Sequence, residues 1–185
     1  MFPNDWEIEF VAVGRELRES VLWSPGLKTT TRRAIVLSGD RADTLTEGGA
    51  EPVVCGSVGN YVYDPNPAVG RAGLIDELAT SLHAAKLDPQ IAFLTGDVLM
   101  PTPFARVLPV IESMPWHERE VKAELKRLGV GRLDVRRRGL AGDVEAITKR
   151  LKATGPVHAV LLMTRLQGRP WAIICAAGLK GREGE

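Results

Sequence analysis

The sequence contains few of the residues on which many functional sites depend. Its 185 residues include only two cysteines, three histidines, four tryptophans, four phenylalanines and two tyrosines. Cys55 and Cys175 lie far apart, so a disulfide scaffold is excluded and we expect two free thiols. No two histidines share the spacing of metal ligands, and the sequence therefore predicts no metal site.

Long apolar runs and nucleotide-binding loops are missing as well. No segment approaches the roughly 18 apolar residues of a membrane span, and the first residues lack the basic and apolar regions of a secretory signal. We therefore expect a cytoplasmic protein without membrane contact. The segments 57–60 and 129–131 are too short for nucleotide loops, and no Walker or nucleophile-elbow motif occurs. The residues thus predict no cofactor in this chain.

The composition is that of a folded protein with one domain or two small ones. Hydrophobic residues make up 44% and charged residues 25% of the chain. The net charge of +1 conceals an uneven distribution. Residues 1–116 carry 9 basic and 15 acidic side chains, whereas residues 117–185 carry 15 basic and 8 acidic ones. This asymmetry suggests that the C-terminal part faces an anion.

The N-terminal segment is predicted to form strands. Apolar residues alternate with Glu7 and Glu9 over residues 6–12, which is typical of a half-buried strand. Further strands are expected over 21–23 and 34–37, and residues 40–59 are interpreted as a surface loop and a domain boundary. The first strands have little sheet to pack against, so we expect some apolar side chains to stay partly exposed or to pair between chains. These are Trp6, Ile8, Phe10, Val21 and Trp23.

The middle of the chain predicts a helix followed by two strands. Asn66 is a suitable N-cap with Pro67 at the first helical position, and leucines recur every four residues over 74–82. The helix is therefore expected to continue to about Ala85. The two strands are expected over 91–94 and 106–113. Pro109 places the second strand at a sheet edge or a bulge.

The C-terminal third alternates between helices and strands. One amphipathic helix is expected over 117–128, and a second, capped by Asp143, ends near Leu151. Gln167-Gly168 between two apolar runs predicts a β-hairpin. The order strand, helix, strand, helix, hairpin indicates an α/β fold with helices on one face of a mixed sheet.

Basic residues concentrate between Arg119 and Lys152, where eleven lysines or arginines occur. Strand alternation places Arg132, Arg136 and Arg138 on one face, with Lys122 and Lys126 on the preceding helix. Such groups bind the phosphates of nucleic acids through counterion release. A solvated surface, partly neutralised by neighbouring glutamates, explains the pattern about equally well. Three consecutive arginines tip the interpretation toward an anion-binding surface.

A second candidate site is the loop that contains Tyr61, Tyr63, Asp64, Asn66 and Arg71. Its run Asp-Pro-Asn-Pro loosely resembles the Asn/Asp-Pro-Pro-aromatic loop with which amino-methyltransferases grip a target amine. Here the aromatic residues precede the loop instead of following it. A proline-stiffened turn that leads into a capped helix is the favoured interpretation, and catalytic residues stay unassigned.

Three longer motifs carry a more specific resemblance. They are the runs 59–74, 94–97 with 101–106, and 129–139. Together they resemble the C-terminal part of the bacterial class I S-adenosylmethionine-dependent methyltransferases that carry a THUMP-like domain. Residues 6–37 are similar to the last strands of the Rossmann-like methyltransferase core, with 19–23 matching its final antiparallel strand.

The resemblance implies an α/β chain with mixed sheets, on which helices pack. Residues 1–58 would be a remnant of the Rossmann-like methyltransferase core with its linker, and 59–105 a connecting helix–strand unit. Residues 106–177 would form the THUMP-like domain, and 178–185 a disordered tail. The family's cofactor-binding strands, with a glycine-rich loop and an Asp-Pro-Ala-Arg-Arg motif, would precede Trp6 and are absent here.

Function follows from the same resemblance. THUMP domains are associated with structured RNA, so the chain is expected to position an RNA substrate, tRNA or rRNA. S-adenosylmethionine is implied for the full-length family, with the methyltransferase core supplied in cis or in trans. The chain alone is expected to be inactive. The alternative is a protein–protein assembly module that binds no nucleic acid. A complete enzyme acting through Tyr63 and Asp64 is the disfavoured third interpretation.

Overall fold

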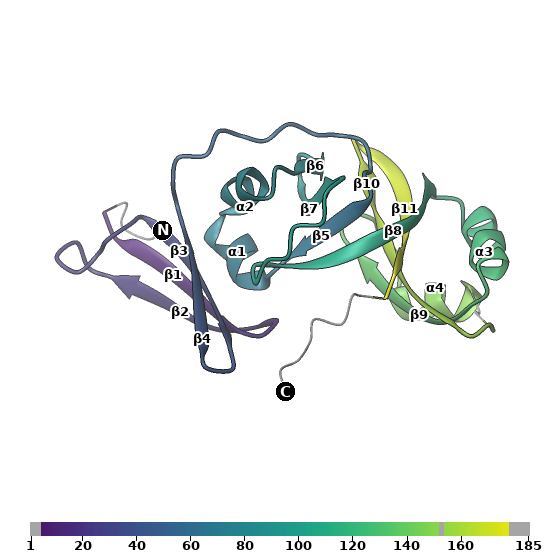
Figure 1. Cartoon of the computed structure of the whole chain (residues 1–185), viewed down its shortest axis with the longest axis horizontal. Coiled ribbons are helices and arrows are strands. Elements are labelled where there is room, and N and C mark those ends of the chain that lie inside the picture. Colours follow the sequence, from purple (N-terminus) through teal and green to yellow (C-terminus); the bar gives the residue numbers. More distant parts are fainter. Residues whose placement is uncertain (1–4, 152–153, 178–185) are drawn as a thin grey trace.

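The computed structural model describes residues 5–151 and 154–177, which form an α/β fold with two mixed β-sheets. The sheets follow one another along the long axis of the molecule (Figure 1). Helices α1 (Pro67–Ala72) and α2 (Ile75–Ser81) lie between them, and α3 (Glu118–Arg127) and α4 (Val144–Leu151) lie at the far end. No helix of the described part is long and apolar enough to cross a membrane. The predicted disordered tail, 178–185, lies outside the described residues.

The N-terminal sheet has four strands in the order β2-β1-β3-β4. Their bounds are β1 Glu7–Val13, β2 Glu16–Trp23, β3 Arg32–Ser38 and β4 Arg41–Thr46. β1 pairs with β2 as an antiparallel hairpin and with β3 in parallel. β4 corrects the prediction of a loop over 40–59, because a tight turn at Gly39, with φ of 56°, folds this segment back onto β3.

The polar side of β1 is buried, which strand alternation did not indicate. Glu7 and Glu9 are 1% and 5% exposed. Glu7 accepts hydrogen bonds from the backbone N–H groups of Thr29 and Thr30 and pairs with Arg33 at 2.8 Å. These partners compensate the desolvation of the carboxylate.

The apolar side chains of β1 and β2 remain partly exposed, as predicted. None of the residues in this set is buried. They are Trp6, Ile8, Phe10, Val21 and Trp23. Leu17 and Leu22 on β2 are 38% and 40% exposed as well. β2 is an edge strand, so this apolar surface borders unpaired backbone.

The second sheet has seven strands in the order β6-β7-β5-β8-β11-β10-β9. Their bounds are β5 Tyr61–Pro65, β6 Ala85–Asp88, β7 Ile91–Gly96, β8 Ala105–Pro115, β9 Val130–Arg137, β10 Val157–Leu166 and β11 Arg169–Ala176. β9 and β10 are parallel, whereas the other pairs are antiparallel. The predicted hairpin forms at Gln167 and Gly168, both of which have positive φ.

β8 links the two halves of this sheet, and Pro109 lies where its pairing changes. Residues 105–109 pair with β5, and residues 110–115 pair with β11. The register with β11 also shifts between Ile174 and Cys175, which indicates a bulge in β8 near Ile111. Pro109 therefore lies in an interior strand. It pairs with β5 and not with β11, so its missing N–H leaves no ladder hydrogen bond to β11 unformed.

The single helix predicted over 67–85 is two short helices. Asn66 caps α1, as expected, by accepting a hydrogen bond from the backbone N–H of Ala68. Gly73 ends α1 in the left-handed conformation, with φ of 74°. The chain then restarts as α2 and continues into β6. The leucine spacing holds across this break, because Leu74, Leu78 and Leu82 all enter one core.

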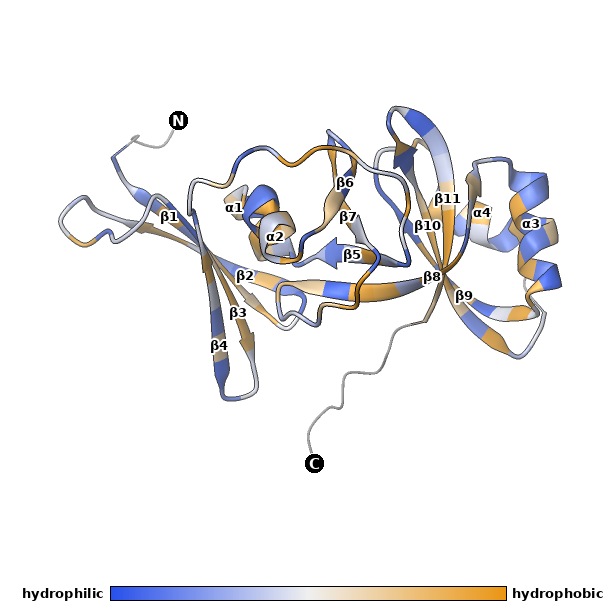
Figure 2. Ribbon diagram, turned by 45° about the horizontal axis from the view of Figure 1, so that its top comes forward, coloured by the Kyte–Doolittle hydropathy of each residue, from blue (hydrophilic) through white to orange (hydrophobic). Residues whose placement is uncertain are grey.

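Helices α3 and α4 cover one face of the C-terminal part of the second sheet, as predicted. Val121 and Leu125 of α3 and Ile147 and Leu151 of α4 pack against it. Figure 2 shows the two-sided colouring of α3 that this packing requires. Alternate residues of β10 pack on the two opposite faces of the sheet. Ala159, Leu161 and Met163 face the helices, whereas Val160 and Leu162 pack with Val62, Phe93 and Leu108.

We expect Asn66→Ala to lower the free energy of unfolding by about 1–3 kcal/mol. Asn66 is 2% exposed, accepts from Ala68 N and donates from Nδ2 to the carbonyl of Gly14 at 2.7 Å. Asn66→Ser keeps a cap acceptor, but its side chain is too short to reach Gly14. This variant should therefore lose about half as much unfolding free energy as Asn66→Ala. Urea denaturation measures both variants. Wild-type stability in Asn66→Ala would contradict the structural role of these bonds.

Candidate functional site

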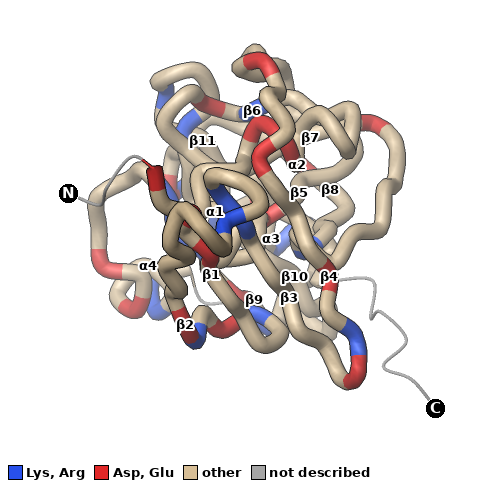
Figure 3. The backbone as a smooth tube through the Cα atoms, turned by 90° about the vertical axis from the view of Figure 1, so that its left-hand side faces the viewer, with Lys and Arg blue, Asp and Glu red and all other residues tan. Residues whose placement is uncertain are grey.

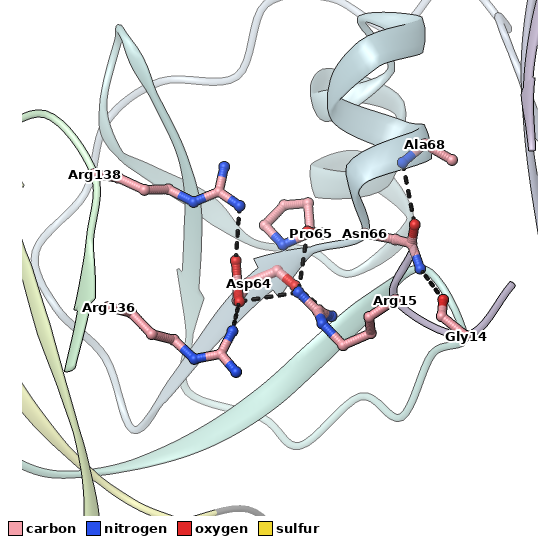
Figure 4. A network of polar contacts seen from close by, with 8 residues as sticks. All are labelled: Gly14, Arg15, Asp64, Pro65, Asn66, Ala68, Arg136 and Arg138. Atoms are coloured by element: carbon pink, nitrogen blue, oxygen red, sulfur yellow. Dashed lines mark hydrogen bonds and ion pairs between the residues drawn. The ribbon is translucent and has the colours of Figure 1, made fainter. Parts of the chain in front are cut away.

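An arginine cluster around Asp64 is the most strongly charged arrangement that the predicted site residues form. Asp64 lies in β5, and only 2% of it is exposed. Its carboxylate accepts hydrogen bonds from three guanidinium groups. Arg15 Nη2 lies 2.9 Å from Oδ2, Arg138 Nη2 lies 3.0 Å from Oδ1, and Arg136 Nη1 donates to Oδ2 (Figure 4). We call Arg15, Arg136, Arg138 and Asp64 the Asp64 cluster.

The cluster joins three segments that are distant in sequence. Arg15 lies in the tight turn between β1 and β2, where Gly14 has φ of 56°. Arg136 lies near the end of β9, and Arg138 follows the strand. Strand alternation directs Arg136 and Arg138 to the same side, as predicted, and Arg137 instead donates to the carbonyl of Leu140.

Positive charge exceeds negative charge in the cluster. Three arginines share one carboxylate, and Arg106 of β8 pairs opposite Asp64 in the β5–β8 ladder. Burial lowers the pKa of Arg15, Asp64 opposes this shift, and Arg136, Arg106 and Arg138 lower the pKa further as like charges. The arginine side chains of the cluster are 31–40% exposed, so the guanidinium groups reach solvent while the carboxylate does not.

Arg138 has a second contact that orients it. Its guanidinium carbon lies 5.1 Å from the centre of the Phe93 ring, within the range of a cation–π interaction. Phe93 itself is fully buried in the core between β7 and β10. The position of Arg138 is therefore determined by both the carboxylate and the core.

The loop predicted as a second site has mainly structural contacts. Tyr63 is fully buried, donates its hydroxyl hydrogen to the carbonyl of Val98 at 2.6 Å and accepts from Met100 N–H. Asn66 is engaged by the helix cap and by Gly14. Tyr61 packs at the edge of the same core, and Arg71 is exposed on α1. The structure thus confirms the capped helix, whereas the predicted loop is wrong, because Tyr61, Tyr63 and Asp64 lie in strand β5, which leads through Asn66 directly into α1.

The predicted basic surface is divided between two faces of the sheet. Leu133 and Val135 pack toward α3 and α4, so the alternate residues Arg132 and Arg136 point to the opposite face. Lys122 and Lys126 lie on α3 and are exposed there. Lys122 donates to the backbone carbonyl of Arg150 at the end of α4, at 2.8 Å. The structure therefore brings Arg136 and Arg138 together and separates them from the lysines.

Charges elsewhere on the molecule are interspersed. Figure 3 shows both basic and acidic residues scattered along the tube. Arg150 pairs with Glu118, and Arg127 pairs with Glu124. Much of the positive charge of α3 and α4 is therefore locally balanced, which agrees with a solvated surface there.

A cavity of about 540 Å³ lies between the β6–β7 turn and the β10–β11 hairpin. Asp88 on its wall accepts from the N–H groups of Gln90 and Gly168 at 2.9 and 2.8 Å, and Arg165 donates to Gln90. These bonds tie the two turns together. None of the sequence-predicted site residues lines the cavity.

Other reactive groups do not form a site. No group of side chains suited to hold a metal ion occurs among the residues that the structure describes. Both cysteines are free, as predicted. Burial raises the pKa of Cys175 to about 12, which keeps this thiol protonated near neutral pH.

Sequence reasoning missed Arg15 and the role of Asp64 as the partner of the arginines. Arg15 precedes Asp64 by 49 residues, and Arg136 follows it by 72. No local periodicity relates such positions. The signal in the sequence was an aspartate directly before a proline, and this signal indicated a turn.

Comparisons with known proteins agree with the resemblance found in the sequence. Residues 105–177 match the family described as THUMP domain-like. Two curated relatives, from the CDC 1551 and H37Rv strains of Mycobacterium tuberculosis, are named as uncharacterised S-adenosylmethionine-dependent methyltransferases. Each is 36% identical over 164 residues, which are 86% of this chain and 44% of the relative. The chain thus spans less than half the length of these relatives.

A solved structure supports the fold. It is the crystal structure of a candidate methyltransferase from Porphyromonas gingivalis W83, with a TM-score of 0.71 and 19% sequence identity. The similarity covers 94% of this chain and 46% of that one. Residues 105–177 are therefore similar to the THUMP-like family, and most of the chain is similar to part of the S-adenosylmethionine-dependent methyltransferases.

Proposed function

We propose that this chain is the RNA-binding part of an S-adenosylmethionine-dependent methyltransferase and positions structured RNA, tRNA or rRNA, for methylation. The cofactor site and the catalytic residues belong to a methyltransferase core outside these 185 residues, joined in cis or in trans. The observation that carries the proposal is the arginine-rich strand β9 within a THUMP-like domain.

The charge of β9 supports an RNA-facing role. Arg132 is exposed on the same face as Arg136, and the Asp64 cluster continues that face with more positive than negative charge. Phosphates are attracted to such groups because binding releases condensed counterions. Contacts to phosphates position a nucleic acid without reading its base sequence.

The N-terminal sheet supports the presence of a separate core. β2 is an edge strand whose residues are mostly exposed, and Leu17, Leu22 and Trp23 leave apolar surface beside it. Exposed edges of this kind pair with further strands. We propose that residues 1–58 contact the methyltransferase core, that 59–105 connect them to the THUMP-like domain and that 106–177 hold the RNA.

The same edge also favours the second candidate function, an assembly module without nucleic-acid binding. Exposed apolar residues on an edge strand are sufficient for protein–protein contact. The two functions differ in one measurable property. Only the first requires RNA affinity that falls with salt and depends on β9.

We expect the isolated chain not to bind S-adenosylmethionine measurably. No strand–glycine loop–helix unit suited to the cofactor was found in the sequence. Isothermal titration calorimetry of the purified chain tests this. Micromolar binding with unit stoichiometry would contradict the proposal and would favour a complete enzyme.

We expect Arg132→Ala to flatten the slope of log affinity against log salt by about 0.7–0.9. One phosphate contact would be lost, and affinity should fall similarly for different RNA sequences. Fluorescence anisotropy with a tRNA pool at several salt concentrations measures both. Arg41→Ala is the matched control, because this arginine is 78% exposed on the N-terminal sheet. Salt-independent RNA binding, or none, would leave the assembly module as the better function.

The cluster arginines need a separate stability test, because their partner is buried. Replacing Arg136 and Arg138 by alanine leaves the carboxylate of Asp64 with Arg15 alone. We expect the double variant to lose about 1–3 kcal/mol of unfolding free energy. Adding Asp64→Asn removes the buried charge and should recover part of the loss. Urea denaturation compares the variants, and an unchanged double variant would show that solvent compensates Asp64.

A further inference from the structure

We propose that Arg15, Arg136 and Arg138, with Arg106 beside them, form a binding site for a phosphate group. In this site Asp64 is a positioning residue that holds the arginines in place. That the phosphate belongs to RNA rests on the proposed function, whereas the existence of the site does not.

The charge of the site is not balanced by the chain. Asp64 is the carboxylate that Arg15, Arg136 and Arg138 share among the described residues, and it supplies one negative charge against three. Arg106 adds a fourth positive charge near Arg15. Each further arginine adds repulsion, and a bound anion would relieve it.

Donors remain available on the solvent side of the cluster. A guanidinium group has five N–H donors. Arg136 and Arg138 each bind Asp64 through one terminal nitrogen. Their side chains are 31% and 40% exposed, whereas that of Asp64 is 3% exposed. In Figure 4 the guanidinium groups of Arg138 and Arg136 approach the two oxygens of Asp64 from opposite ends of the carboxylate, and Arg15 approaches from another side.

The arrangement suits phosphate in particular. A phosphate group presents several oxygens to the planar forks of neighbouring arginines, and such pairs are often bidentate. The carboxylate of Asp64 and the Phe93 ring hold the arginines before any ligand arrives. Binding therefore loses less side-chain entropy than on flexible surface arginines.

Arg15 gives the site a property that β9 alone lacks. It comes from the turn between β1 and β2, outside the THUMP-like residues 105–177. It also donates to the backbone carbonyl of Asp64 at 3.2 Å, which fixes its position relative to β5. A phosphate held by Arg15 and β9 together would thus be placed relative to the N-terminal sheet as well as to the THUMP-like domain.

The test is a phosphate titration of the full chain and of Arg15→Ala. The probes are inorganic phosphate and a short RNA with either a 5′-phosphate or a 5′-hydroxyl, and binding is followed by calorimetry. We expect the wild type to bind and Arg15→Ala to bind about tenfold or more weakly. Asp64 keeps Arg136 and Arg138 in this variant, so the fold should persist, which thermal melting checks. The control Arg18→Ala, 57% exposed on β2, should change affinity by less than about twofold.

A second variant keeps the proposal testable if Arg15→Ala does not fold. Arg138→Gln keeps Arg15 and Arg136 on the carboxylate and should also weaken binding. A preference for the 5′-phosphate would identify a terminal monoester as the ligand, and equal binding of both RNAs would identify a backbone diester. Equal affinities of wild type and both folded variants would overturn the site. If Arg132→Ala still flattened the salt slope, RNA binding would stand without it.

Discussion

The burial of the Asp64 carboxylate is the constraint on which the arrangement of the whole chain depends. An ionised carboxylate at 2% exposure is stable only with charged partners. Those partners come from the β1–β2 turn and from the end of β9, so the N-terminal sheet and strands β5 and β9 of the second sheet meet at one side chain. Asn66 strengthens the same junction, because it caps α1 and binds Gly14 next to Arg15.

The second sheet connects Asp64 and its arginine partners to the hydrophobic core. β8 pairs with β5 over its first half and with β11 over its second half, which joins β6, β7 and β5 to β11, β10 and β9 in one continuous sheet. β10 packs helices on one side and Phe93, Val62 and Leu108 on the other. The alternation of side chains along β9 therefore directs Arg136 toward Asp64 and packs the partly buried Leu133 and Val135 toward α3 and α4.

Local signals were sufficient for most elements and insufficient for their long-range contacts. Caps and turns at Asn66, Asp143 and Gln167-Gly168 predicted helix starts and a hairpin correctly, because each depends on neighbouring residues. Gly73 was placed inside a helix because leucine spacing continues across the break. Glu7 and the pairing of Asp64 with Arg15 could not be predicted, since both depend on residues brought together only by the fold.

The division of the basic residues has a consequence for how RNA could be oriented. The lysines of α3 lie on the helical face, where pairs such as Glu118–Arg150 balance much of the charge. The unbalanced charge lies on the other face, beside Arg15 and thus beside the hairpin that carries the exposed β2 edge. Electrostatic attraction is strongest where positive charge is least compensated. An RNA drawn to this face would therefore lie next to the strand at which a methyltransferase core is proposed to dock, which is the geometry that substrate positioning requires.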